Sequence, residues 1–473
     1  MNNILEATFS KPIKKLFFVG IGGSSMSGLA GIAKEQGFEV EGSDMVESPY
    51  TERLIKSGIP VHIGHTDHNI PEGTDLVIYS AAIHADNPDM QRAEELCIPK
   101  VERSEYLGLL SRAFPKTIGI AGTHGKTTTS SMVASILHHG GLDPSVSIGG
   151  RLDEIGGNAC LGSSDYFVIE SCEFVDSFLK TRHKIGVITN IEEDHLDYFK
   201  GGLPQIMDSF HRFGMILPED GYMVAYGDQP EVREVCQGLR CPVVYYGLGE
   251  DNDWNARNIR YDSLGNPTFE AWHGDELVDD FSLKVPGQHN VLDALAAIAV
   301  GDYVGVNPDI IQESLNTFGG AHRRFEFRGE VNGISVYEDY AHHPTELKVV
   351  IDACMNHEHN ELWVVFQPHT YSRTKLLFDE FVDAFEKADK IILNDIYSDR
   401  EGNEEWQIYS EDLAKIIKEK YKKPTIVMSE FEDIVKFLTD NLHKDDLVLV
   451  AGSQTINKVA YMLVDALKEK YGE

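Results

Sequence analysis

A glycine-rich turn followed by one lysine and a run of hydroxyl side chains occupies residues 119–132, GIAGTHGKTTTSSM. An apolar run precedes this turn and a helix-favouring stretch follows it. In the pattern GxxxxGK[ST], loop amides and a helix N-terminus bind phosphate and the lysine reaches the terminal phosphates. Gly125, Lys126 and Thr127 fit it, and the variant GxxGTxGKTT is intact although Ile120 stands at the first glycine. We expect ATP here, with Lys126 clamping phosphate; a purely structural turn is the alternative.

Short apolar runs alternate with amphipathic stretches from end to end, which is typical of parallel sheets connected by crossover helices. The runs that we expect to form strands are residues 16–19, 76–79, 117–120, 166–169, 186–189, 362–366, 391–393 and 447–450. A chain of 473 residues also exceeds what one hydrophobic core usually serves. Polar seams near 111–116 and 319–323 therefore predict three α/β domains, at 1–113, 114–321 and 322–473.

The formal net charge of −34 bears on the choice of partners. So acidic a surface repels nucleic acid and anionic membranes, and we expect neither as a partner. No apolar run approaches the ~18 residues of a membrane span, and residues 1–15 lack the apolar core of a signal peptide. The six cysteines form no CxxC pair, so neither a zinc site nor a disulfide framework is indicated. We expect a reduced, cytoplasmic protein.

The first segment opens with a second glycine-rich turn, LFFVGIGGSSMSGLA. Gly20 and Gly22 match a dinucleotide fingerprint, but Ser25 replaces its third glycine. Asp44 lies about where a ribose-binding acid falls, ~20 residues on. Two interpretations stay open, a nucleotide-binding first domain or a tight turn without ligand. A nicotinamide-dependent dehydrogenase is disfavoured by Ser25 and by the separate GKT loop.

Acids and histidines follow two expected strands of the middle segment, in VIESCEFVDSFL and VITNIEEDHLDYF. Glu170 and His195 then lie at the carboxyl edge of the sheet, where open α/β sheets bind ligands. Glu170 suits a magnesium ion between phosphates because hard cations take oxygen ligands. His195 suits a second metal or a phosphate. Each residue alone could be structural, and their occurrence in the segment with the phosphate loop favours a functional role.

Two polar motifs distinguish the final segment, EDYAHHPTE at 338–346 and FQPHTYSRT at 366–374. Two adjacent histidines follow Asp339, and His369 and Arg373 follow the next expected strand. Arg373 can bind a carboxylate through two parallel hydrogen bonds. The histidine pair fits either a metal site or a polar turn, and the lack of an obvious third ligand disfavours metal.

Together these motifs resemble those of the Mur ligase family. Nine of them occur in the family's order over nearly the whole chain: GIGGSSMSGLA, SAAIHADNPD, GTHGKTTT, ESCEFVDSFL, TNIEEDHLDYF, GQHN, HRRFE, EDYAHHPTE and FQPHTYSRT. The resemblance implies a Rossmann-like UDP-sugar-binding domain, a central P-loop ATPase-type domain with a mainly parallel sheet, and a Rossmann-like, amino-acid-binding C-terminal domain that closes over them.

The resemblance also implies ATP-dependent formation of an amide bond. The lactyl carboxylate of UDP-N-acetylmuramate takes the γ-phosphoryl group, and the amine of L-alanine attacks the resulting acyl phosphate. Two anions meet in the first step, so cations must neutralise their approach. We expect ATP and Mg²⁺ as cofactors and a monomer or weak homodimer. The final segment is expected to swing as a unit, because the amine must be kept away until the acyl phosphate forms.

The same resemblance assigns site residues by motif. The catalytic residues implied are Lys126, Glu170, His195 and Arg373, and the metal ligands implied are Thr127, Glu170 and His195. The implied ATP-binding residues are Gly122, Thr123, His124, Gly125, Lys126, Thr127, Thr128, His289, Asn290, Arg324 and Asp339. The UDP moiety would contact Gly22, Gly23, Asp44, His65 and Ser80. The amino-acid pocket would consist of Tyr340, His342, His369 and Arg373, the last binding the alanine carboxylate.

Several positions depart from the family's pattern. Ser24 and Ser25 replace a frequent Ile-Gly, Thr370 replaces a frequent arginine, and Asp293 replaces a frequent asparagine. Relatives that add later residues of the peptide carry a carbamylated lysine in a helix after the histidine motif. Residues 206–214, IMDSFHRFG, contain no lysine, which favours the alanine-adding branch.

Two other functions stay open. A recycling ligase that attaches a whole tripeptide to the same sugar nucleotide is the nearest alternative, and the tyrosine of DYAHHPTE favours free alanine over it. An ATP-binding protein without catalysis is the alternative of another class.

Overall fold

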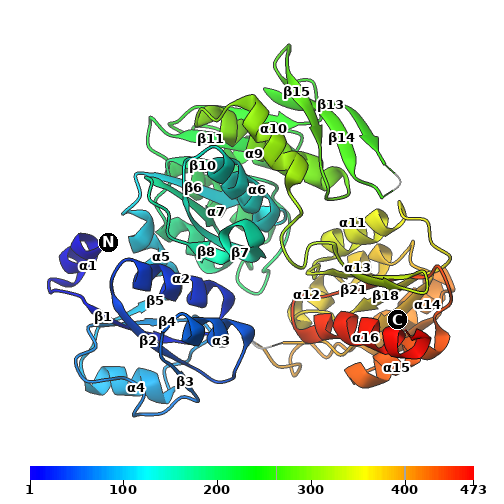
Figure 1. The fold of residues 1–473 in the computed structure, drawn as a ribbon, viewed down its shortest axis with the longest axis horizontal. Coiled ribbons are helices and arrows are strands. Elements are labelled where there is room, and N and C mark those ends of the chain that lie inside the picture. The colour runs from blue at the N-terminus through cyan, green and yellow to red at the C-terminus, as the bar shows by residue number, and fades with distance from the viewer. Residues whose placement is uncertain (263, 399–400, 473) are drawn as a thin grey trace.

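The computed structural model describes residues 1–262, 264–398 and 401–472. These residues form three β-sheets of five, ten and six strands with helices packed around them (Figure 1). The predicted α/β class with three domains is therefore confirmed. The second sheet begins at Lys116 and the third at Glu326, while the domain limits 1–113, 114–321 and 322–473 stay a prediction.

The first sheet is entirely parallel, in the order β3-β2-β1-β4-β5. Its strands are β1 (Lys15–Val19), β2 (Glu39–Asp44), β3 (Val61–Ile63), β4 (Leu76–Tyr79) and β5 (Lys100–Glu102), and the helices are α1 (Asn2–Phe9), α2 (Ser24–Glu35), α3 (Pro49–Lys56), α4 (Pro88–Glu95) and α5 (Arg103–Ser111). The strand order reverses between β1 and β4. In doubly wound sheets ligands bind at the crevice that this reversal creates.

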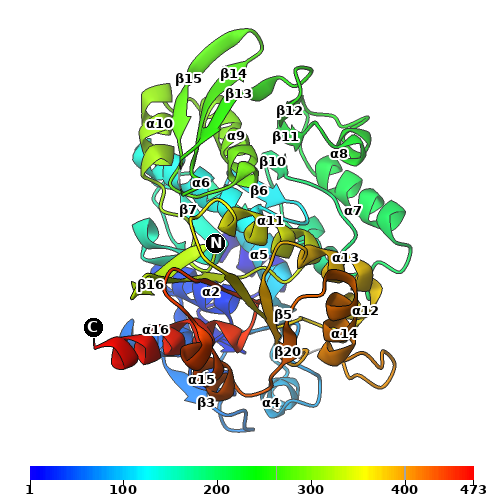
Figure 2. The ribbon, with the colours of Figure 1, turned by 90° about the vertical axis from the view of Figure 1, so that its right-hand side faces the viewer.

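The second sheet has the order β15-β14-β13-β12-β11-β10-β6-β9-β7-β8. Its first strands are β6 (Lys116–Ala121), β7 (Ser145–Leu152), β8 (Gly157–Cys160), β9 (Tyr166–Glu170) and β10 (Ile185–Ile188). The others are β11 (Tyr222–Tyr226), β12 (Val243–Gly247), β13 (Trp254–Tyr261), β14 (Pro267–His273) and β15 (Glu276–Ser282). Parallel pairing runs from β7 to β13, and antiparallel strands close both ends of the sheet. The sheet is thus mainly parallel, and β13–β15 project at one end of the molecule (Figure 2).

Helices of the middle segment connect these strands. They are α6 (Lys126–His139), α7 (Leu203–Met215), α8 (Pro230–Val235), α9 (Gln288–Tyr303) and α10 (Pro308–Thr317), with 3₁₀ turns η1 (Asp153–Ile155) and η2 (Phe174–Lys180). Helix α6 is buried on nearly all sides against α9, which explains its run of small and hydroxyl side chains in place of a one-sided apolar stripe.

The third sheet has the order β16-β17-β21-β18-β19-β20, with only β16 antiparallel. Its strands are β16 (Glu326–Val331), β17 (Ile334–Asp339), β18 (Leu362–Phe366), β19 (Lys390–Leu393), β20 (Thr425–Val427) and β21 (Leu447–Ala451). Its helices are α11 (Pro344–Cys354), α12 (Tyr371–Leu376), α13 (Phe378–Ala384), α14 (Ser410–Tyr421), α15 (Phe431–Asn441) and α16 (Lys458–Tyr471), with η3 (Thr455–Asn457). Helix α11 lies on the side that faces the middle segment (Figure 1).

The three segments are joined by different kinds of contact. Phe167 and Ile169 of β9 belong to the same apolar cluster as the core of the first segment. Helix α2 packs so closely on β8 that a Cβ at Gly28 would lie 2.7 Å from the Ala159 Cβ. The clusters of the final segment contain only residues from 325 onwards. The first two segments therefore share a core, whereas the final segment has its own and meets the middle one mainly through polar side chains.

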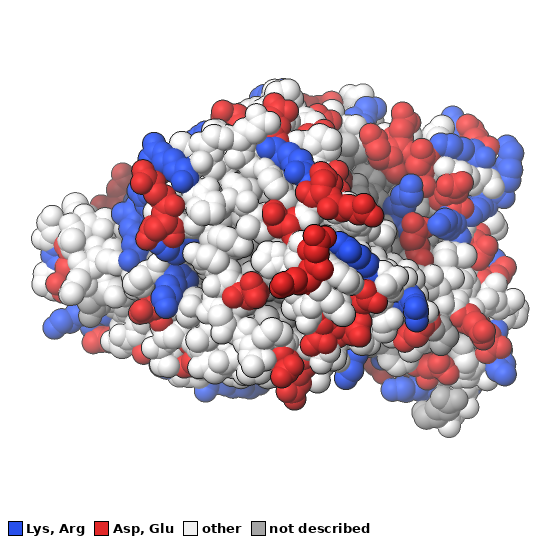
Figure 3. Space-filling model, turned by 90° about the horizontal axis from the view of Figure 1, so that it is seen from above, with Lys and Arg blue, Asp and Glu red and all other residues white. Residues whose placement is uncertain are grey.

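Charged side chains of both signs are interspersed on the face drawn in Figure 3. The negative net charge is therefore not gathered into one patch on that face. Within the described part of the chain, no helix combines the length and the apolar character needed to cross a membrane.

Candidate active site

The loop between β6 and α6 has the shape that a phosphate cradle requires. Gly122 has φ 145°, and a Cβ there would overlap the Thr189 hydroxyl. Gly125 has φ 80° and caps α6, and a Cβ there would lie 2.5 Å from Asp293 Oδ1. Only glycine meets both conditions without strain. The loop amides and the first turn of α6 consequently point into one space.

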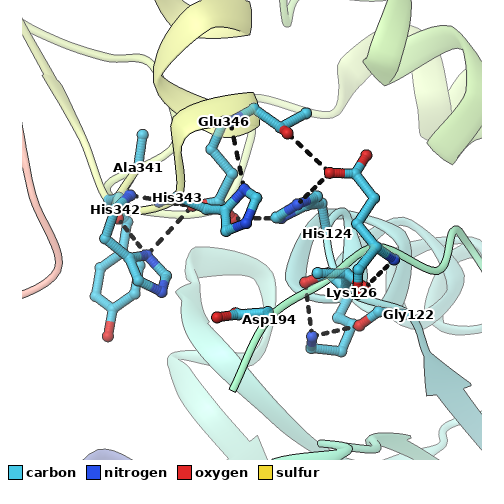
Figure 4. A network of polar contacts seen from close by, with 12 residues as sticks. Gly122, His124, Lys126, Asp194, Ala341, His342, His343 and Glu346 are labelled. Atoms are coloured by element: carbon cyan, nitrogen blue, oxygen red, sulfur yellow. Dashed lines mark hydrogen bonds and ion pairs between the residues drawn. The ribbon is translucent and has the colours of Figure 1, made fainter. Parts of the chain in front are cut away.

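Lys126 is held by two main-chain carbonyls and one carboxylate of its own segment. Its amine donates to the carbonyls of Gly122 and Thr123 and forms an ion pair with Glu173 (3.0 Å), as Figure 4 shows in part. Burial opposes the charge of Lys126, but its neighbours, with Glu173 and Glu170 among them, together outweigh burial, so the pKa of Lys126 is raised. The lysine stays cationic, as a phosphate clamp must.

The residues expected to bind metal fall into two neighbouring groups. Thr127 Oγ1 donates to Glu170 Oε2 (2.8 Å), which also accepts from the Gly149 amide (2.7 Å). His195 Nε2 instead lies 3.6 Å from Asp194 and 3.9 Å from Glu173. Ligand atoms of this second group lie within 4.8 Å of one another. The oxygen-rich donor set fits a hard divalent cation.

Two cavities meet at the phosphate loop. One, of about 290 Å³, lies between α9, the phosphate loop and α11. The other, of about 470 Å³, contains Lys126, Glu170 and His195. Both are lined by His124, Gly125, Arg324 and Glu346. A ligand with an apolar end and a polyphosphate tail could therefore lie across both.

The smaller cavity collects most of the residues expected around the nucleotide. It is lined by His124, Gly125, Thr128, His289, Asn290, Arg324 and Asp339. Burial lowers the pKa of His289 to about 4, so this imidazole is neutral at pH 7. The Asn290 amide donates to the Pro286 carbonyl (2.7 Å), which fixes the start of α9. Arg324 reaches from the final segment to Thr127 Oγ1 (3.4 Å).

Asp339 supports this arrangement from the end of β17. Its carboxyl accepts from the amides of Phe325 and Ala341, each at 2.6 Å. Burial raises its pKa to about 6, against the influence of Arg324. The carboxyl therefore ties the turn that carries Arg324 to the start of the histidine motif.

The four residues expected to bind the amino acid form a row. The Tyr340 and His342 rings lie 5.4 Å apart, and the His342 and His369 rings 5.9 Å. Arg373 donates to the His369 carbonyl (3.1 Å). Its guanidinium also binds Asp194 through Nε (3.0 Å) and Nη2 (2.9 Å). Arg373 thus binds a carboxylate as expected, but that carboxylate belongs to the middle segment of this chain.

The residues expected along the UDP moiety lie at the carboxyl edge of the first sheet. Asp44 accepts from the Gly22 amide (2.8 Å), and Gly23 caps α2. Ser80 N, just after β4, donates to Val19 O (3.2 Å). His65 Nδ1 is 2.6 Å from buried Asp89. Ser24 and Tyr50 bring this edge to the larger cavity.

Comparison with known proteins agrees with this geometry. Three family models match: "Mur ligase family, catalytic domain" over residues 15–115, "Mur ligase middle domain" over 120–301, and "Mur ligase, glutamate ligase domain" over 323–454. A UDP-N-acetylmuramate–L-alanine ligase of Caldanaerobacter subterraneus is 43% identical, over 96% of this chain and 98% of that relative. The chain belongs to the Mur ligase family.

Other relatives agree with this assignment. The Acetivibrio thermocellus protein of the same name is 43% identical, over 97% of this Mur ligase and 96% of that relative. The crystal structure of a UDP-N-acetylmuramate–alanine ligase of Thermotoga maritima superposes with a TM-score of 0.81 at 28% identity, over 96% of this chain and 99% of that one. A murein peptide ligase of Psychrobacter arcticus, at 24% identity and TM-score 0.75, shares the fold, over 96% and 98% of the two chains.

One further polar group of this Mur ligase joins the middle and final segments. His124, Glu192 and His343 place possible ligand atoms within 4.8 Å of one another. His343 Nδ1 accepts from the Thr345 amide and Nε2 faces the Glu193 carbonyl, so its ring nitrogens are both engaged. His124 lies between two carboxylates. Ion pairs and hydrogen bonds hold this group together, and the expectation against metal at the histidine pair stays a prediction.

Four site residues were missed by sequence analysis: Glu173, Glu192, Asp194 and Glu346. Three of them stand in or beside the acid runs ESCE and EEDH, where spacing alone does not separate a site residue from a solvated one. Glu346 lies three residues after His343 at the start of a helix, so its position in the sequence indicates a helix cap. Their partners are far away in the sequence, so their roles become visible only in the folded structure.

Proposed function

We propose that this Mur ligase joins L-alanine to the lactyl carboxylate of UDP-N-acetylmuramate, with conversion of ATP to ADP and phosphate. Relatives of that name are 42–43% identical over nearly the entire chain, which supports the assignment. The observation that carries the proposal is the meeting of two cavities at the phosphate loop, one suited to a nucleotide and one reaching the Tyr340–Arg373 row.

We propose that the smaller cavity takes the adenosine of ATP and the phosphate loop its phosphates. Lys126 exchanges Glu173 for phosphate oxygens, and Arg324 supplies a second cation from the final segment. These cations reduce repulsion while the substrate carboxylate oxygen attacks the γ-phosphorus and ADP departs. The product of this step is a mixed anhydride, whose carbonyl carbon is a far better electrophile than a carboxylate.

We propose that Thr127, Glu170 and His195 hold magnesium, with Glu173 and Asp194 beside His195. Bound Mg²⁺ would supply further positive charge next to the transferring phosphoryl group. The oxygen donors of Thr127 and Glu170 already converge, which supports their assignment.

We propose that L-alanine binds along Tyr340, His342, His369 and Arg373. For Arg373 to take the alanine carboxylate, Asp194 must release it. The amine nitrogen then attacks the acyl carbon, and phosphate leaves as the tetrahedral intermediate collapses. Separation of the final segment from the middle one would admit the amino acid and let products leave. A monomer or weak homodimer and a cytoplasmic location stay predictions.

The test is ADP formation by purified protein over a panel of UDP-sugars and amino acids. We expect turnover only when ATP, UDP-N-acetylmuramate and L-alanine are all present, with the amide product detected by mass spectrometry. ATP consumption without an amide product would refute the proposal.

The same panel separates the alternatives. The recycling activity is less well supported, since relatives named as L-alanine ligases are 42–43% identical over nearly the entire chain, whereas two recycling-ligase structures are 24% and 30% identical. Competition between L-alanine and the free tripeptide for UDP-N-acetylmuramate decides between the two substrates. Thermal stabilisation by NAD and not by UDP-N-acetylmuramate would favour a dehydrogenase, and nucleotide binding without turnover would favour a non-catalytic protein.

A further inference from the structure

Glu346 connects two parts of the site that belong to different segments. It stands in the first turn of α11, in the final segment. Its Oε1 lies 3.1 Å from Nδ1 of His124 in the phosphate loop. Its Oε2 accepts from the amides of His342 (3.0 Å) and His343 (3.2 Å), as Figure 4 shows. One carboxylate therefore fixes the start of the amino-acid pocket against the phosphate loop.

The His124 imidazole is held from both sides. Its Nε2 lies 3.4 Å from Glu192, which also accepts from the Thr345 hydroxyl of α11 (2.7 Å). Burial alone would lower the pKa of His124, but the adjacent carboxylates of Glu192 and Glu346 raise it to about 9. Despite burial, the neighbouring imidazoles of His342 and His124 hold the pKa of Glu346 well below its usual range. The His124–Glu346 pair is thus a charge-assisted hydrogen bond between the middle and final segments, and such bonds are stronger than those between neutral groups.

The position of His124 makes this contact informative about the nucleotide. It lies between Gly122 and Gly125, and its carbonyl is bound by Thr189 and Asn190. The loop that would receive phosphates therefore also presents the imidazole that Glu346 binds. At the other oxygen, Glu346 holds the main chain of His342, whose Nδ1 is 3.2 Å away. A shift of either segment would break the contacts of Glu346 that connect the phosphate loop to the amino-acid pocket.

We propose that Glu346 is a positioning residue that sets the amino-acid pocket in register with the occupied phosphate loop through His124. The proposal rests on the proposed function for the identity of the amino acid. Capping α11 uses only Oε2, whereas positioning needs Oε1 as well. The two roles can therefore be separated by experiment.

The experiment compares Glu346→Gln with wild type and with Asp412→Asn. Asp412 is an exposed residue of the final segment that caps α14 in the same way, accepting from the Tyr409 amide (2.9 Å). We expect E346Q to raise KM for L-alanine about tenfold or more, because a hydrogen bond to a charged partner is lost. KM for UDP-N-acetylmuramate and the melting temperature should change no more than in D412N. An unchanged KM for L-alanine with a lower melting temperature would refute the positioning role, because Glu346 would then only cap α11.

A double-mutant cycle adds a second readout. If Glu346 acts through His124, E346Q/H124Q should lose little more kcat/KM than the more damaged single variant. If the fold-losses in kcat/KM of the two single variants multiply in the double variant, the two residues act independently and the proposal is overturned.

Hydrogen exchange keeps the proposal separate from the identity of the substrates. Addition of ATP should slow amide exchange over residues 340–346 in wild type, and less so in E346Q. This result would support the positioning role even if the L-alanine ligase assay failed. Equal slowing in both proteins would refute it even if that assay succeeded.

Discussion

Asp293 gives a quantitative test of the packing around the phosphate loop. Its carboxyl is buried behind Gly125, and Oδ1 accepts from the Thr129 hydroxyl (2.9 Å). Burial raises the pKa of Asp293 from 3.8 to about 7, although Thr129 and Arg324 act in the opposite direction. The proton is therefore bound more tightly in the folded protein than in the unfolded chain.

The sign of the pH dependence follows from that difference. Below the unfolded pKa both states carry the proton, and the carboxyl costs no stability. As the pH rises, the unfolded chain ionises first, so the free energy of unfolding falls until the folded carboxyl also ionises near pH 7. Between the two pKa values, each pH unit lowers the free energy of unfolding by about 1.4 kcal/mol. Between pH 5 and pH 7 the loss is about 2 kcal/mol, because the folded carboxyl is already half ionised at pH 7.

Asp293→Asn keeps the acceptor for Thr129 and removes the ionisation. We expect the difference in unfolding free energy between D293N and wild type to grow by about 3 kcal/mol in favour of D293N from pH 5 to pH 8. Urea denaturation followed through the transition of the middle segment measures it. Asp302→Asn, an exposed change on the same helix, is the matched control. Parallel pH curves for D293N and wild type would refute the reasoning.

Three further changes test other parts of the site. Gly122→Ala should lower the free energy of unfolding by about 1–3 kcal/mol and weaken ATP binding, because the new Cβ overlaps Thr189 at an unfavourable φ. Gly141→Ala is the control, since Gly141 also has a positive φ but nothing lies within 4 Å of the added Cβ. Lys126→Ala should lower kcat about 100-fold or more in the ADP assay, and retained turnover would remove its proposed role. Chelation by EDTA should stop ADP formation and added Mg²⁺ restore it; full activity in EDTA would exclude the metal assignment.

The fold was largely predictable because strands buried on both faces follow a local sequence rule in all three segments. Fully buried parallel strands such as β18 and β21 are continuous apolar runs, which stand out in any sequence. The expected strand at 186–189 differs from β10 (Ile185–Ile188) by one residue at each end. The antiparallel β13–β15 unit was not singled out, because its half-exposed strands carry charges and alternate only weakly.

The site was predictable only where a motif carries its own geometry. The GKT loop specifies its strand, turn and helix, so Lys126, Thr127 and Gly125 could be assigned at once. The ion pairs Lys126–Glu173, Arg373–Asp194 and His124–Glu346 could not, because their partners lie 47, 179 and 222 residues apart. Such pairs depend on how distant parts of the chain pack against one another, and a pattern of residue types does not specify that packing.

The contact between the middle and final segments is built from charges, and this choice has a physical consequence. Breaking a buried pair by deleting one partner is costly, since the other charge is left without water. Separating two intact segments is different, because Arg373, Asp194, His124 and Glu346 all regain solvent together. An apolar interface of equal size would lose its full burial energy on opening. We therefore expect a final segment with its own core and a charged contact surface to separate at lower cost than one with an apolar contact surface, and an incoming phosphate to change the charge balance at that surface.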